Sequence, residues 1–363
     1  MRKILFISNG HGEDLVAVEM IKKLAGKAEI SVLPVVGEGK PFKDLKVKVL
    51  GPMKKLPSGG FSLRNLLYLP QDIYAGLIGN TLEQIGLLRE LQGGFDLAVA
   101  IGDIVPIIGA LLVKSPFIFV GVNKSDYYKW FGSRYTLWEK LLLQRYALKV
   151  YTRDRITEQN LKSRGIKIPS AEYAGNPLMD CINSPVQRPG NPDPRLVNIG
   201  FLPGTRDDAK LNLEDFDRIA EEIIKLKHAD IKFKFVTATA LKNVPGYMEN
   251  MSFADLLAVS DLVIGLSGTG NEQAAGSGIP VISFYGSGSQ YNARFGEAQK
   301  ELLGEALLLV RDHDPLSVAA EVWQLLHHPE KMKHMGRMGR ERMGSAGAVE
   351  KICEYITKNV LER

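Results

Sequence analysis

A glycine- and hydroxyl-rich turn in the second half of the chain has the composition of an anion-binding site. The residues Ser267-Gly-Thr-Gly-Asn-Glu272 follow an apolar run and precede a segment of helical periodicity. Glycines let the backbone approach a ligand closely, and the free N–H groups at a helix start point toward an anion. The residues expected to cradle a diphosphate are Ser267, Gly268, Thr269, Gly270 and Asn271. Glu272 or Gln273 can hold ribose hydroxyls, and the structural alternative is a tight turn with an N-cap.

A second loop in the same half of the chain offers a cation. The segment Leu202-Pro-Gly-Thr-Arg206 ends an apolar strand pattern, so we expect it at the same edge of the sheet as the glycine turn. Arg206 can bind phosphate oxygens through two parallel hydrogen bonds. Gly204 and Thr205 are expected beside the phosphates as well. The alternative for Arg206 is an ordinary arginine on a surface loop.

The first loop of the chain, Ser8-Asn-Gly-His-Gly-Glu-Asp14, combines glycines with titratable side chains. The residues expected to line an acceptor site are Asn9, Gly10 and Gly12. His11 titrates near neutral pH and is a candidate acid or base. Glu13 and Asp14 can equally serve as acids that cap the following helix. The spacing is not G-x-G-x-x-G, so this loop is not the dinucleotide-binding fingerprint.

A third candidate is a carboxylate, Asp103, at the end of Ala100-Ile-Gly-Asp103. An acid just past the carboxyl end of an apolar strand is partly desolvated, which can raise its pKa toward that of a useful base. An aspartate in a turn after glycine is also common structure. We predict that Asp103 is the first candidate for a general base and that His11 is the second.

These residues need a scaffold, and the periodicity of the chain predicts one. Short β-branched runs alternate with helical patterns, which is typical of βαβ units and parallel sheets. The predicted strands are Lys3–Ser8, Ile30–Val35, Lys46–Leu50, Leu97–Ala100, Phe117–Val120, Val150–Thr152, Leu196–Leu202, Lys232–Thr237, Leu262–Leu266 and Val281–Phe284. The predicted helices are Glu13–Leu24, Leu82–Leu91, Val105–Leu112, Trp138–Arg145, Ile156–Ser163, Leu213–Leu226, Ser252–Val259, one after the glycine turn, and 347–360.

Four prolines within Asn183–Pro194 predict a linker between two α/β domains. We expect an N-terminal acceptor-binding domain over 1–182, a linker over 183–195 and a C-terminal nucleotide-sugar-binding domain over 196–346. A final helix within 347–363 is expected to pack back on the first domain. Two doubly wound domains of this kind face a central cleft, with ligands beyond the carboxyl ends of the strands.

Composition narrows the function classes. The chain has 363 residues, a formal net charge of +5 and two cysteines, Cys181 and Cys353. Two cysteines argue against a disulfide framework and favour the cytoplasm. No Lys/Arg block is interleaved with aromatics, so nucleic acid is not an expected partner. The apolar region from Ile104 to Val122 is broken by prolines and a lysine, which predicts a core helix and a buried strand rather than a membrane span.

Aromatic and basic residues alternate in Tyr127-Tyr-Lys-Trp-Phe131 and again in Tyr135-Thr-Leu-Trp138. An apolar and aromatic surface rimmed by cations would suit a lipid acceptor and a peripheral contact with a membrane surface. The segment Met53–Leu91, with Leu56-Pro-Ser-Gly-Gly-Phe61, extends this pattern. The structural alternative is ordinary core and the wall of an acceptor pocket.

Together these motifs resemble the lipid-A-disaccharide synthase family, and most closely its "lipid-A-disaccharide synthase-related" branch. The matching segments span nearly the whole chain in order, and each is weak alone. They are Ser8–Asp14, Leu56-Pro-Ser-Gly-Gly60, Lys124-Ser-Asp-Tyr-Tyr128, Gly175-Asn-Pro-Leu-Met-Asp180, Leu202–Arg206 and Ser267–Gln273.

The resemblance implies a GT-B fold, a UDP-sugar donor held mainly by the second domain, and inverting transfer to a lipid-linked or sugar acceptor. It implies no metal ion and no further cofactor. Asp103 matches the family's essential aspartate, and Arg206 matches the arginine of its Leu-Pro-Gly-Ser-Arg loop. Lys124 and Tyr127 fall in a matching segment and are expected to contact the acceptor.

Two departures from the family pattern matter. The family's first loop reads Gly-Glu-x-Ser-Gly-Asp where this chain has Asn-Gly-His-Gly-Glu-Asp, so the acceptor can differ from the lipid A precursor. The family's ribose-binding glutamate lies six residues after the serine. That position is Gln273 here and the acid is Glu272, so both stay candidates.

Three functions follow from these residues. The first is a metal-independent UDP-sugar glycosyltransferase in the cytoplasm, peripheral on the inner face of the plasma membrane. The second is a UDP-N-acetylhexosamine 2-epimerase, which shares a Ser-Gly turn followed by acids and needs no lipid face. The third is a protein that binds nucleotide-sugars without catalysis. Donor sugar incubated without an acceptor separates the first two, because only an epimerase then forms an epimer.

Overall fold

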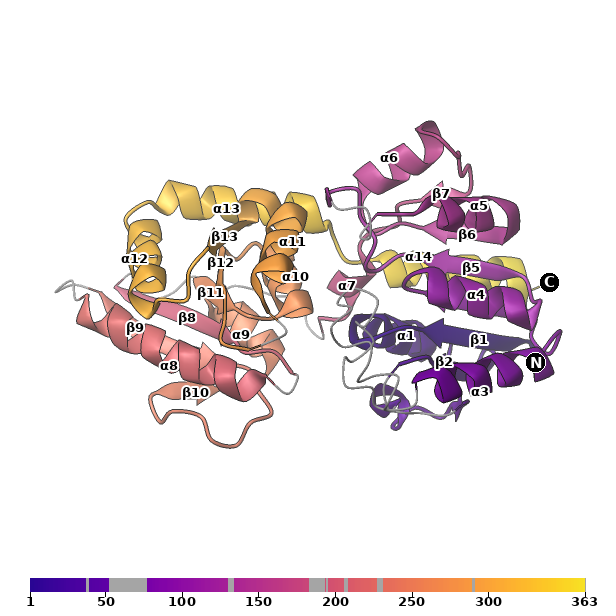
Figure 1. Ribbon diagram of the computed structural model, residues 1–363, viewed down its shortest axis with the longest axis horizontal. Coiled ribbons are helices and arrows are strands. Elements are labelled where there is room, and N and C mark those ends of the chain that lie inside the picture. Colours follow the sequence, from indigo (N-terminus) through magenta and orange to yellow (C-terminus); the bar gives the residue numbers. More distant parts are fainter. Residues whose placement is uncertain are drawn as a thin grey trace. The chain divides into compact units, whose positions relative to one another are not determined.

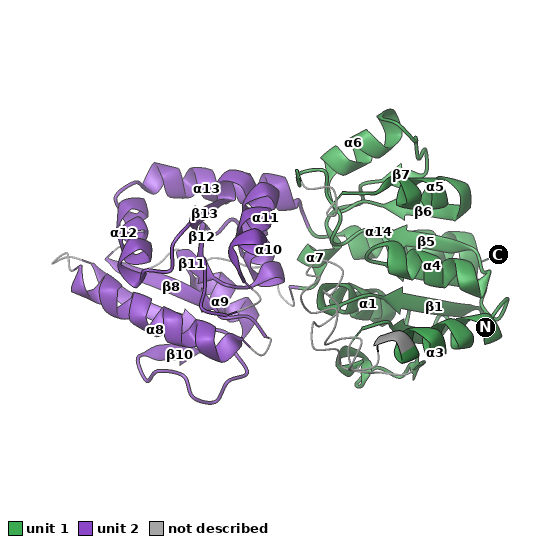
Figure 2. Cartoon of the chain, in the orientation of Figure 1, with its two compact units in different colours: residues 1–181, 346–363 green, residues 182–345 purple. Residues whose placement is uncertain are grey.

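The computed structural model describes residues 1–36, 39–51, 77–129, 134–182, 193, 195–205, 208–226, 231–288 and 291–362. The chain divides into two compact units (Figure 2). Unit 1 comprises residues 1–181 and 346–363, and unit 2 comprises residues 182–345. The chain therefore leaves unit 1 once and returns to it for its last residues.

Unit 1 is built on a parallel sheet of seven strands in the order β3-β2-β1-β4-β5-β6-β7 (Figure 1). The strands are β1 (Lys3–Ser8), β2 (Glu29–Pro34), β3 (Lys48–Val49), β4 (Leu97–Ile101), β5 (Phe117–Val120), β6 (Ala147–Tyr151) and β7 (Ala171–Glu172). Every pairing in the sheet is parallel. The central strands are continuous apolar runs, as expected for strands buried on both faces.

Helices cover both faces of this sheet, and β1 shows why. Its side chains alternate, so Ile4 and Phe6 join one core cluster while Leu5 and Ile7 join another. The helices of unit 1 are α1 (His11–Leu24), α3 (Leu77–Glu90), α4 (Ile104–Val113), α5 (Leu137–Tyr146), α6 (Arg155–Ser163), α7 (Pro177–Asp180) and α14 (Ala348–Ile356), with 3₁₀ turn η1 (Lys40–Phe42) and π turn η5 (Thr357–Leu361). The first cluster contains residues of α1 and α14, and the second contains residues of α4 and α5.

Unit 2 repeats the plan with a parallel sheet of six strands in the order β10-β9-β8-β11-β12-β13. Its strands are β8 (Leu196–Leu202), β9 (Lys232–Thr237), β10 (Met248–Asn250), β11 (Leu262–Gly265), β12 (Val281–Phe284) and β13 (Leu307–Val310). Its helices are α8 (Ala209–Lys225), α9 (Phe253–Val259), α10 (Gly268–Gly276), α11 (Ala293–Leu303), α12 (Pro315–Leu326) and α13 (Pro329–Met343), with 3₁₀ turn η4 (Gly304–Ala306). The predicted α/β class with two doubly wound domains is confirmed.

The C-terminal helix α14 packs on unit 1, although the chain enters it from unit 2. Asp180, the last residue of α7, accepts hydrogen bonds from the backbone N–H of Gly347 at 2.6 Å and of Val349 at 3.0 Å. Ile352 and Ile356 are fully buried in the first core cluster beside α1. The carboxylate thus satisfies amides at the start of α14, where a helix has no partners of its own for them.

The elements differ from the predicted ones mainly at their ends and in what short segments do. Helix α1 begins at His11, two residues before the predicted start at Glu13. Strands β7, β10 and β13 and helices α7, α11, α12 and α13 were not predicted individually. Most of the predicted linker, 183–192 and 194, lies outside the described residues. Within the described part of the chain, no helix is both long and apolar enough to cross a membrane.

Candidate functional site

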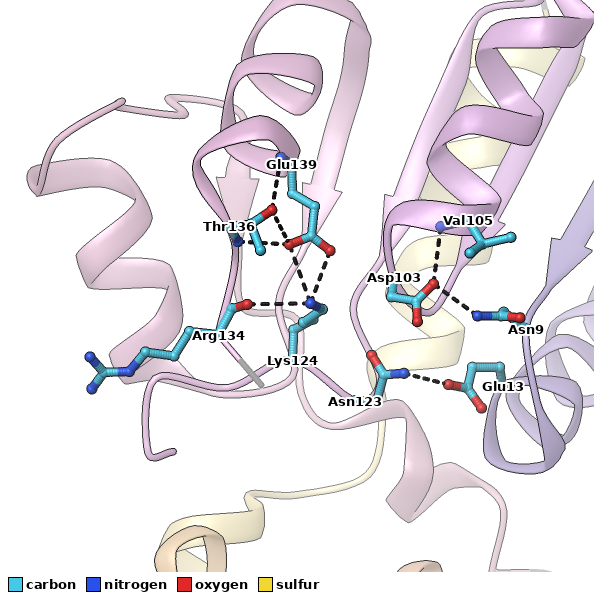
Figure 3. Close-up of polar contacts among 9 residues, drawn as sticks. All are labelled: Asn9, Glu13, Asp103, Val105, Asn123, Lys124, Arg134, Thr136 and Glu139. Atoms are coloured by element: carbon cyan, nitrogen blue, oxygen red, sulfur yellow. Dashed lines mark hydrogen bonds and ion pairs between the residues drawn. The ribbon is translucent and has the colours of Figure 1, made fainter. Parts of the chain in front are cut away.

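In unit 1 the strand order reverses between β1 and β4, and the loops that follow these two strands meet there. Asn9, after β1, donates from Nδ2 to Oδ1 of Asp103 at 2.9 Å. The backbone N–H of Val105 donates to the same oxygen at 3.0 Å, so Asp103 is also the N-cap of α4 (Figure 3). Two donors therefore fix one carboxylate oxygen at the position where such sheets bind ligands.

The second oxygen of Asp103 is in a different situation. Among the residues that the structure describes, the hydrogen bonds to this carboxylate reach only Oδ1. The side chain is half-buried, so Oδ2 is neither sealed in the core nor fully in solvent. A carboxylate with one oxygen held and one open is suited to accept a proton from a bound hydroxyl.

Glu13 lies beside Asp103 and fills space that two glycines leave. It is 7% exposed, and its Oε1 accepts a hydrogen bond of 2.8 Å from Asn123 Nδ2, beyond the end of β5 (Figure 3). A Cβ at Gly10 would lie 2.8 Å from Glu13 Oε2, and one at Gly102 would lie 3.2 Å from Glu13 Cγ. Both glycines also have positive φ, +146° and +127°, so this junction needs glycine twice.

Asp14 is a second buried acid in the first turn of α1. Ser8 Oγ donates to its Oδ1 at 2.5 Å, and both side chains are almost fully buried. Burial raises the pKa of Asp14 to about 7, and the hydrogen bond from Ser8 opposes this shift without cancelling it. The carboxyl of Asp14 is therefore held by Ser8 and has a pKa close to neutral pH. His11 of the same loop is exposed, and Gly12 is half-buried.

Lys124, a predicted acceptor contact, is engaged with protein groups. It is 5% exposed, its Nζ lies 3.0 Å from Glu139 Oε1, and it donates to the carbonyl of Arg134 at 3.3 Å (Figure 3). Glu139 also accepts from the Thr136 N–H at 2.7 Å in a capping box at the start of α5. The ammonium thus ties the segment after β5 to α5. Tyr127 is half-buried, and its N–H donates to Ser125 Oγ at 3.1 Å.

In unit 2 the strand order reverses between β8 and β11, and the glycine turn follows β11. Ser267 is the N-cap of α10, with its Oγ accepting from the Gly270 N–H at 3.2 Å. Ser267, Gly268 and Thr269 are half-buried, whereas α10 is buried from Gly270 onward. The first N–H groups of a helix have no partner within it, so the accessible end of α10 presents donors and the positive end of the helix dipole.

The loop after β8 lies against the glycine turn. Leu266 N–H donates to the carbonyl of Leu202 at 3.0 Å, and a Cβ at Gly204 would lie 3.5 Å from the carbonyl oxygen of Leu266. Gly204 has φ +82°, a conformation that favours glycine. Thr205 is exposed. Arg206, the predicted phosphate ligand, lies outside the described residues.

Asn271, predicted to touch the donor, lies beneath the helix start instead. Its side chain is fully buried, and Nδ2 donates to the carbonyl of Gly265 at 3.1 Å and to the hydroxyl of Tyr291 at 3.3 Å. Ser283 Oγ donates to the same Gly265 carbonyl at 2.6 Å. These bonds clamp α10 to the ends of β11 and β12. We therefore assign Asn271 a positioning role.

Glu272 and Gln273 are 8% and 5% exposed and stand one turn into α10. Gln299, from α11, donates to Glu272 Oε1 at 3.1 Å and to the carbonyl of Gly268 at 3.4 Å. Sequence reasoning missed Gln299, Asn123 and Ser283, because nothing in their surroundings in the sequence marks them. Within the described residues, no group of three or more His, Cys, Asp or Glu side chains is placed to hold a metal ion.

Comparison with known proteins gives a likeness in structure only. No protein-family model matches the chain, and no curated protein matches it. Among solved structures, a putative UDP-N-acetylglucosamine 2-epimerase from Listeria monocytogenes is 16% identical, with a TM-score of 0.62 over 99% of this chain and 97% of that one. The chain has the GT-B fold.

Two further structures have similar scores. MnaA of S. aureus, in a co-structure with UDP, has a TM-score of 0.62 at 16% identity, over 98% of this chain and 96% of that one. The calicheamicin glycosyltransferase CalG4 has a TM-score of 0.61 at 16% identity, over 99% of both chains. The same fold thus occurs in proteins named as epimerases and as transferases, so the GT-B fold leaves the reaction to be argued from the site.

Proposed function

We propose that this protein is a UDP-sugar enzyme, and specifically an inverting glycosyltransferase that moves a hexosamine or hexose to a lipid-linked or sugar acceptor. The observation that carries the proposal is the accessible start of α10 at the order reversal of the sheet in unit 2. Similarly folded structures support the donor class, because one contains UDP and others are named for UDP-N-acetylglucosamine.

The donor site is the turn from Ser267 to Gly270 together with the loop after β8. Backbone N–H groups at the start of α10 and the hydroxyl of Thr269 bind the diphosphate, and Gly204 lets its loop approach without steric hindrance. Arg206 adds a bidentate contact to the phosphates. As the sugar departs, UDP gathers negative charge. Preorganised donors at a helix start stabilise that charge, which is the role a metal ion plays in other transferases.

The acceptor site is the junction of the loops after β1 and β4. Oδ2 of Asp103 takes the proton from the acceptor hydroxyl while the hydroxyl oxygen attacks the anomeric carbon and the bond to UDP breaks. Asn9 and the Val105 N–H hold Oδ1 and so aim the open oxygen. His11, exposed on the same loop, is the second candidate for this base.

The acceptor class comes from the resemblance to the lipid-A-disaccharide synthase family, which leads us to propose a lipid-linked acceptor met from the cytoplasmic side of a membrane. The different first loop, with His11 where the family pattern has other residues, is consistent with an acceptor other than the lipid A precursor. Tyr127 remains a proposed acceptor contact, whereas we assign Lys124 to positioning the segment that carries it.

An epimerase is the second candidate, and the likeness to the Listeria structure favours it. An epimerase eliminates UDP from its substrate and adds it back, so it requires an acid and a base close to the sugar and no acceptor. The buried acid Glu13, beside Asp103, and the buried acid Asp14, bonded to Ser8 in the first turn of the same helix, would suit such chemistry.

The deciding experiment incubates the purified chain with UDP-N-acetylglucosamine and related UDP-sugars, with and without lipid acceptors, and follows UDP release and epimer formation. A transferase releases UDP only with an acceptor, and Asp103→Asn abolishes that release. Epimer formation without acceptor overturns the transferase in favour of the epimerase. Tight UDP binding without turnover under every condition supports a non-catalytic binding protein, and no binding of any UDP-sugar overturns the proposal as a whole.

A further inference from the structure

Helix α5 in unit 1 presents large apolar side chains on the face that points away from the core. Trp138 is 72% exposed and Leu137 is 63% exposed, and Leu141 lies one turn further along the same face. Tyr146 and Leu148, where the helix passes into β6, are about half exposed. The inward face already fills its place in the core with Leu143 and Glu139. Leu137 and Trp138 in particular therefore add little to the packing of unit 1.

Scattered exposed apolar residues are normal on a protein surface, but a contiguous set marks a contact with another phase or molecule. The tryptophan is informative because its ring is apolar and its N–H is polar, which suits the boundary between hydrocarbon and water. Helix α5 has 10 residues, too few to span a bilayer and enough to lie in its surface.

The exposed charged side chains of α5 are all positive. The acid within α5, Glu139, is 1% exposed and pairs with Lys124, so it does not contribute to the surface. The other charged residues of α5 are Lys140, half-buried, and Arg145, exposed. Arg145 places its guanidinium 5.6 Å from the centre of the Tyr146 ring. Apolar side chains and cations thus occupy the same helix.

In the neighbouring segments, two of the basic side chains are paired with acids. Arg134, before α5, is exposed, with its guanidinium 4.0 Å from the largely buried carboxylate of Asp126. Lys129 is exposed as well. On β6 and β7, Lys149 and Glu172 pair at 2.5 Å and neutralise each other. The charges that α5 itself exposes, on Lys140 and Arg145, are therefore both positive, and the charges of these neighbouring ion pairs cancel.

Helix α8 in unit 2 provides an internal comparison. It too exposes apolar side chains, Leu211 and Ile224, at 44% and 41%. Between them it exposes Glu214, Arg218 and Glu221, so its outward charges are of both signs. An anionic surface would attract α5 and not α8, which makes α8 a matched control.

We infer that the outward face of α5 docks on the surface of a bilayer containing anionic lipid. The apolar side chains enter the boundary between headgroups and acyl chains, while Lys140 and Arg145 meet lipid phosphates. This inference deepens the proposed use of a lipid-linked acceptor, because it names the surface of unit 1 that brings the protein to that acceptor.

The experiment measures co-sedimentation of the full chain with vesicles of phosphatidylcholine alone and of an equal mixture of phosphatidylcholine and phosphatidylglycerol. We expect binding to the mixed vesicles that weakens at high salt. The double variant Leu137→Ser with Trp138→Ser should bind at least about tenfold more weakly. The double variant Lys140→Gln with Arg145→Gln should lose the preference for anionic vesicles. The control Leu211→Ser with Ile224→Ser should bind like the native chain.

Two experimental results would overturn the inference. One is native protein that ignores the mixed vesicles, or that binds them equally well after the α5 substitutions. The other is a dimer in the absence of lipid that Leu137→Ser with Trp138→Ser dissociates, which would make a second copy of the chain the occupant. UDP affinity of the α5 variants, measured by calorimetry, should equal that of the native chain. Failure of membrane docking is thereby distinguished from failure of the donor site.

Discussion

The two points of strand-order reversal share a topology and differ in chemistry. In unit 1 the reversal between β1 and β4 gathers carboxylates, with Asp103 half-buried, Glu13 buried beside it, and Asp14 buried against Ser8 at the end of β1. In unit 2 the reversal between β8 and β11 presents a serine, two glycines and a threonine at a helix start. The first arrangement is suited to holding and moving protons, and the second is suited to attracting anions. The topology creates both sites, and the side chains decide what each can bind.

Glycine makes room for protein side chains at both reversals. Gly10 and Gly102 make room for the side chain of Glu13, so the backbone there is covered by a carboxylate. At the start of α10, a Cβ at Gly268 would lie 3.0 Å from Phe295 Cζ, and a Cβ at Gly270 would lie 2.7 Å from the Ser267 Oγ that caps the helix. Glycine in a loop therefore indicates close approach, and only the structure shows which group approaches.

The largest effect is expected from Asp103→Asn, which tests whether the carboxylate in unit 1 acts as the general base. The amide oxygen of asparagine can still accept from Asn9 and Val105, so the cap of α4 should survive. Loss of the base should lower the turnover number about 1000-fold, within the range typical of general bases, and leave UDP affinity unchanged. Steady-state kinetics and UDP titration of the same preparation check both parts. A larger loss in His11→Ala than in Asp103→Asn would transfer the role of base to His11.

In unit 2, the substitution Thr269→Glu tests whether the start of α10 binds the diphosphate. Thr269→Gln is the isosteric control. A carboxylate in the first turn of α10 takes the place of the anion and repels a diphosphate, so the Kd for UDP should rise about 100-fold. The same charge is favourable to the helix dipole, and unfolding should be unchanged or slightly harder. Calorimetric titration and thermal unfolding separate these effects. Equal UDP affinity in both variants would remove α10 from the donor site.

Much of the scaffold was predictable because its signals are local. Strands β1, β5 and β8 coincide with the predicted ranges, since each is an apolar run bounded by turn residues. Strands β7 and β10 have two and three residues, too few to show a period. The turn before α10 could be proposed as a donor site because its glycines and hydroxyls are adjacent in the sequence.

The sequence does not show which atoms form contacts between residues that are far apart in the chain. The Asn9–Asp103 bond joins residues 94 positions apart, and the Asn123–Glu13 bond joins residues 110 positions apart. Its place in the glycine turn led to the prediction that Asn271 contacts the diphosphate. Only its packing against Gly265 and Tyr291 shows that it faces inward. Residue types therefore suggest a chemistry for each site, but they do not show the direction in which a side chain points.

The buried acid of unit 1 gives a test by pH. Asp14 titrates near 3.8 when exposed and near 7 in the folded chain, so the folded state binds more protons between these values. The free energy of unfolding should therefore fall as pH rises from about 4 to about 7. Asp14→Asn, which resembles the protonated acid, should raise the free energy of unfolding at pH 8 by up to about 4 kcal/mol and change little at pH 4.

Asp96→Asn is the control of opposite sign. The Lys3 N–H and the Arg2 guanidinium lower the pKa of exposed Asp96, so its contribution to stability is present above its unfolded pKa and lost as pH falls. This variant should be less stable than the native chain at neutral pH, and the difference should shrink toward acid. Chemical unfolding across this pH range measures both curves. An unaltered pH profile in Asp14→Asn would show that the buried acid is not linked to stability.

The smallest effect is expected from weakening the attachment of α14, a helix that packs on unit 1. Asp180→Ala removes the acceptor for the N–H groups of Gly347 and Val349, which should weaken the attachment of the helix by about 1 kcal/mol. Hydrogen exchange should then speed up about fivefold at amides of α14 and of α1, against which it packs. Amides of β11 and α10 should exchange as before, because the first core cluster contains no residue of unit 2. Faster exchange in α10 as well would mean that the two reversals are energetically coupled, and the contrast between them would then describe one cooperative structure rather than two independent sites.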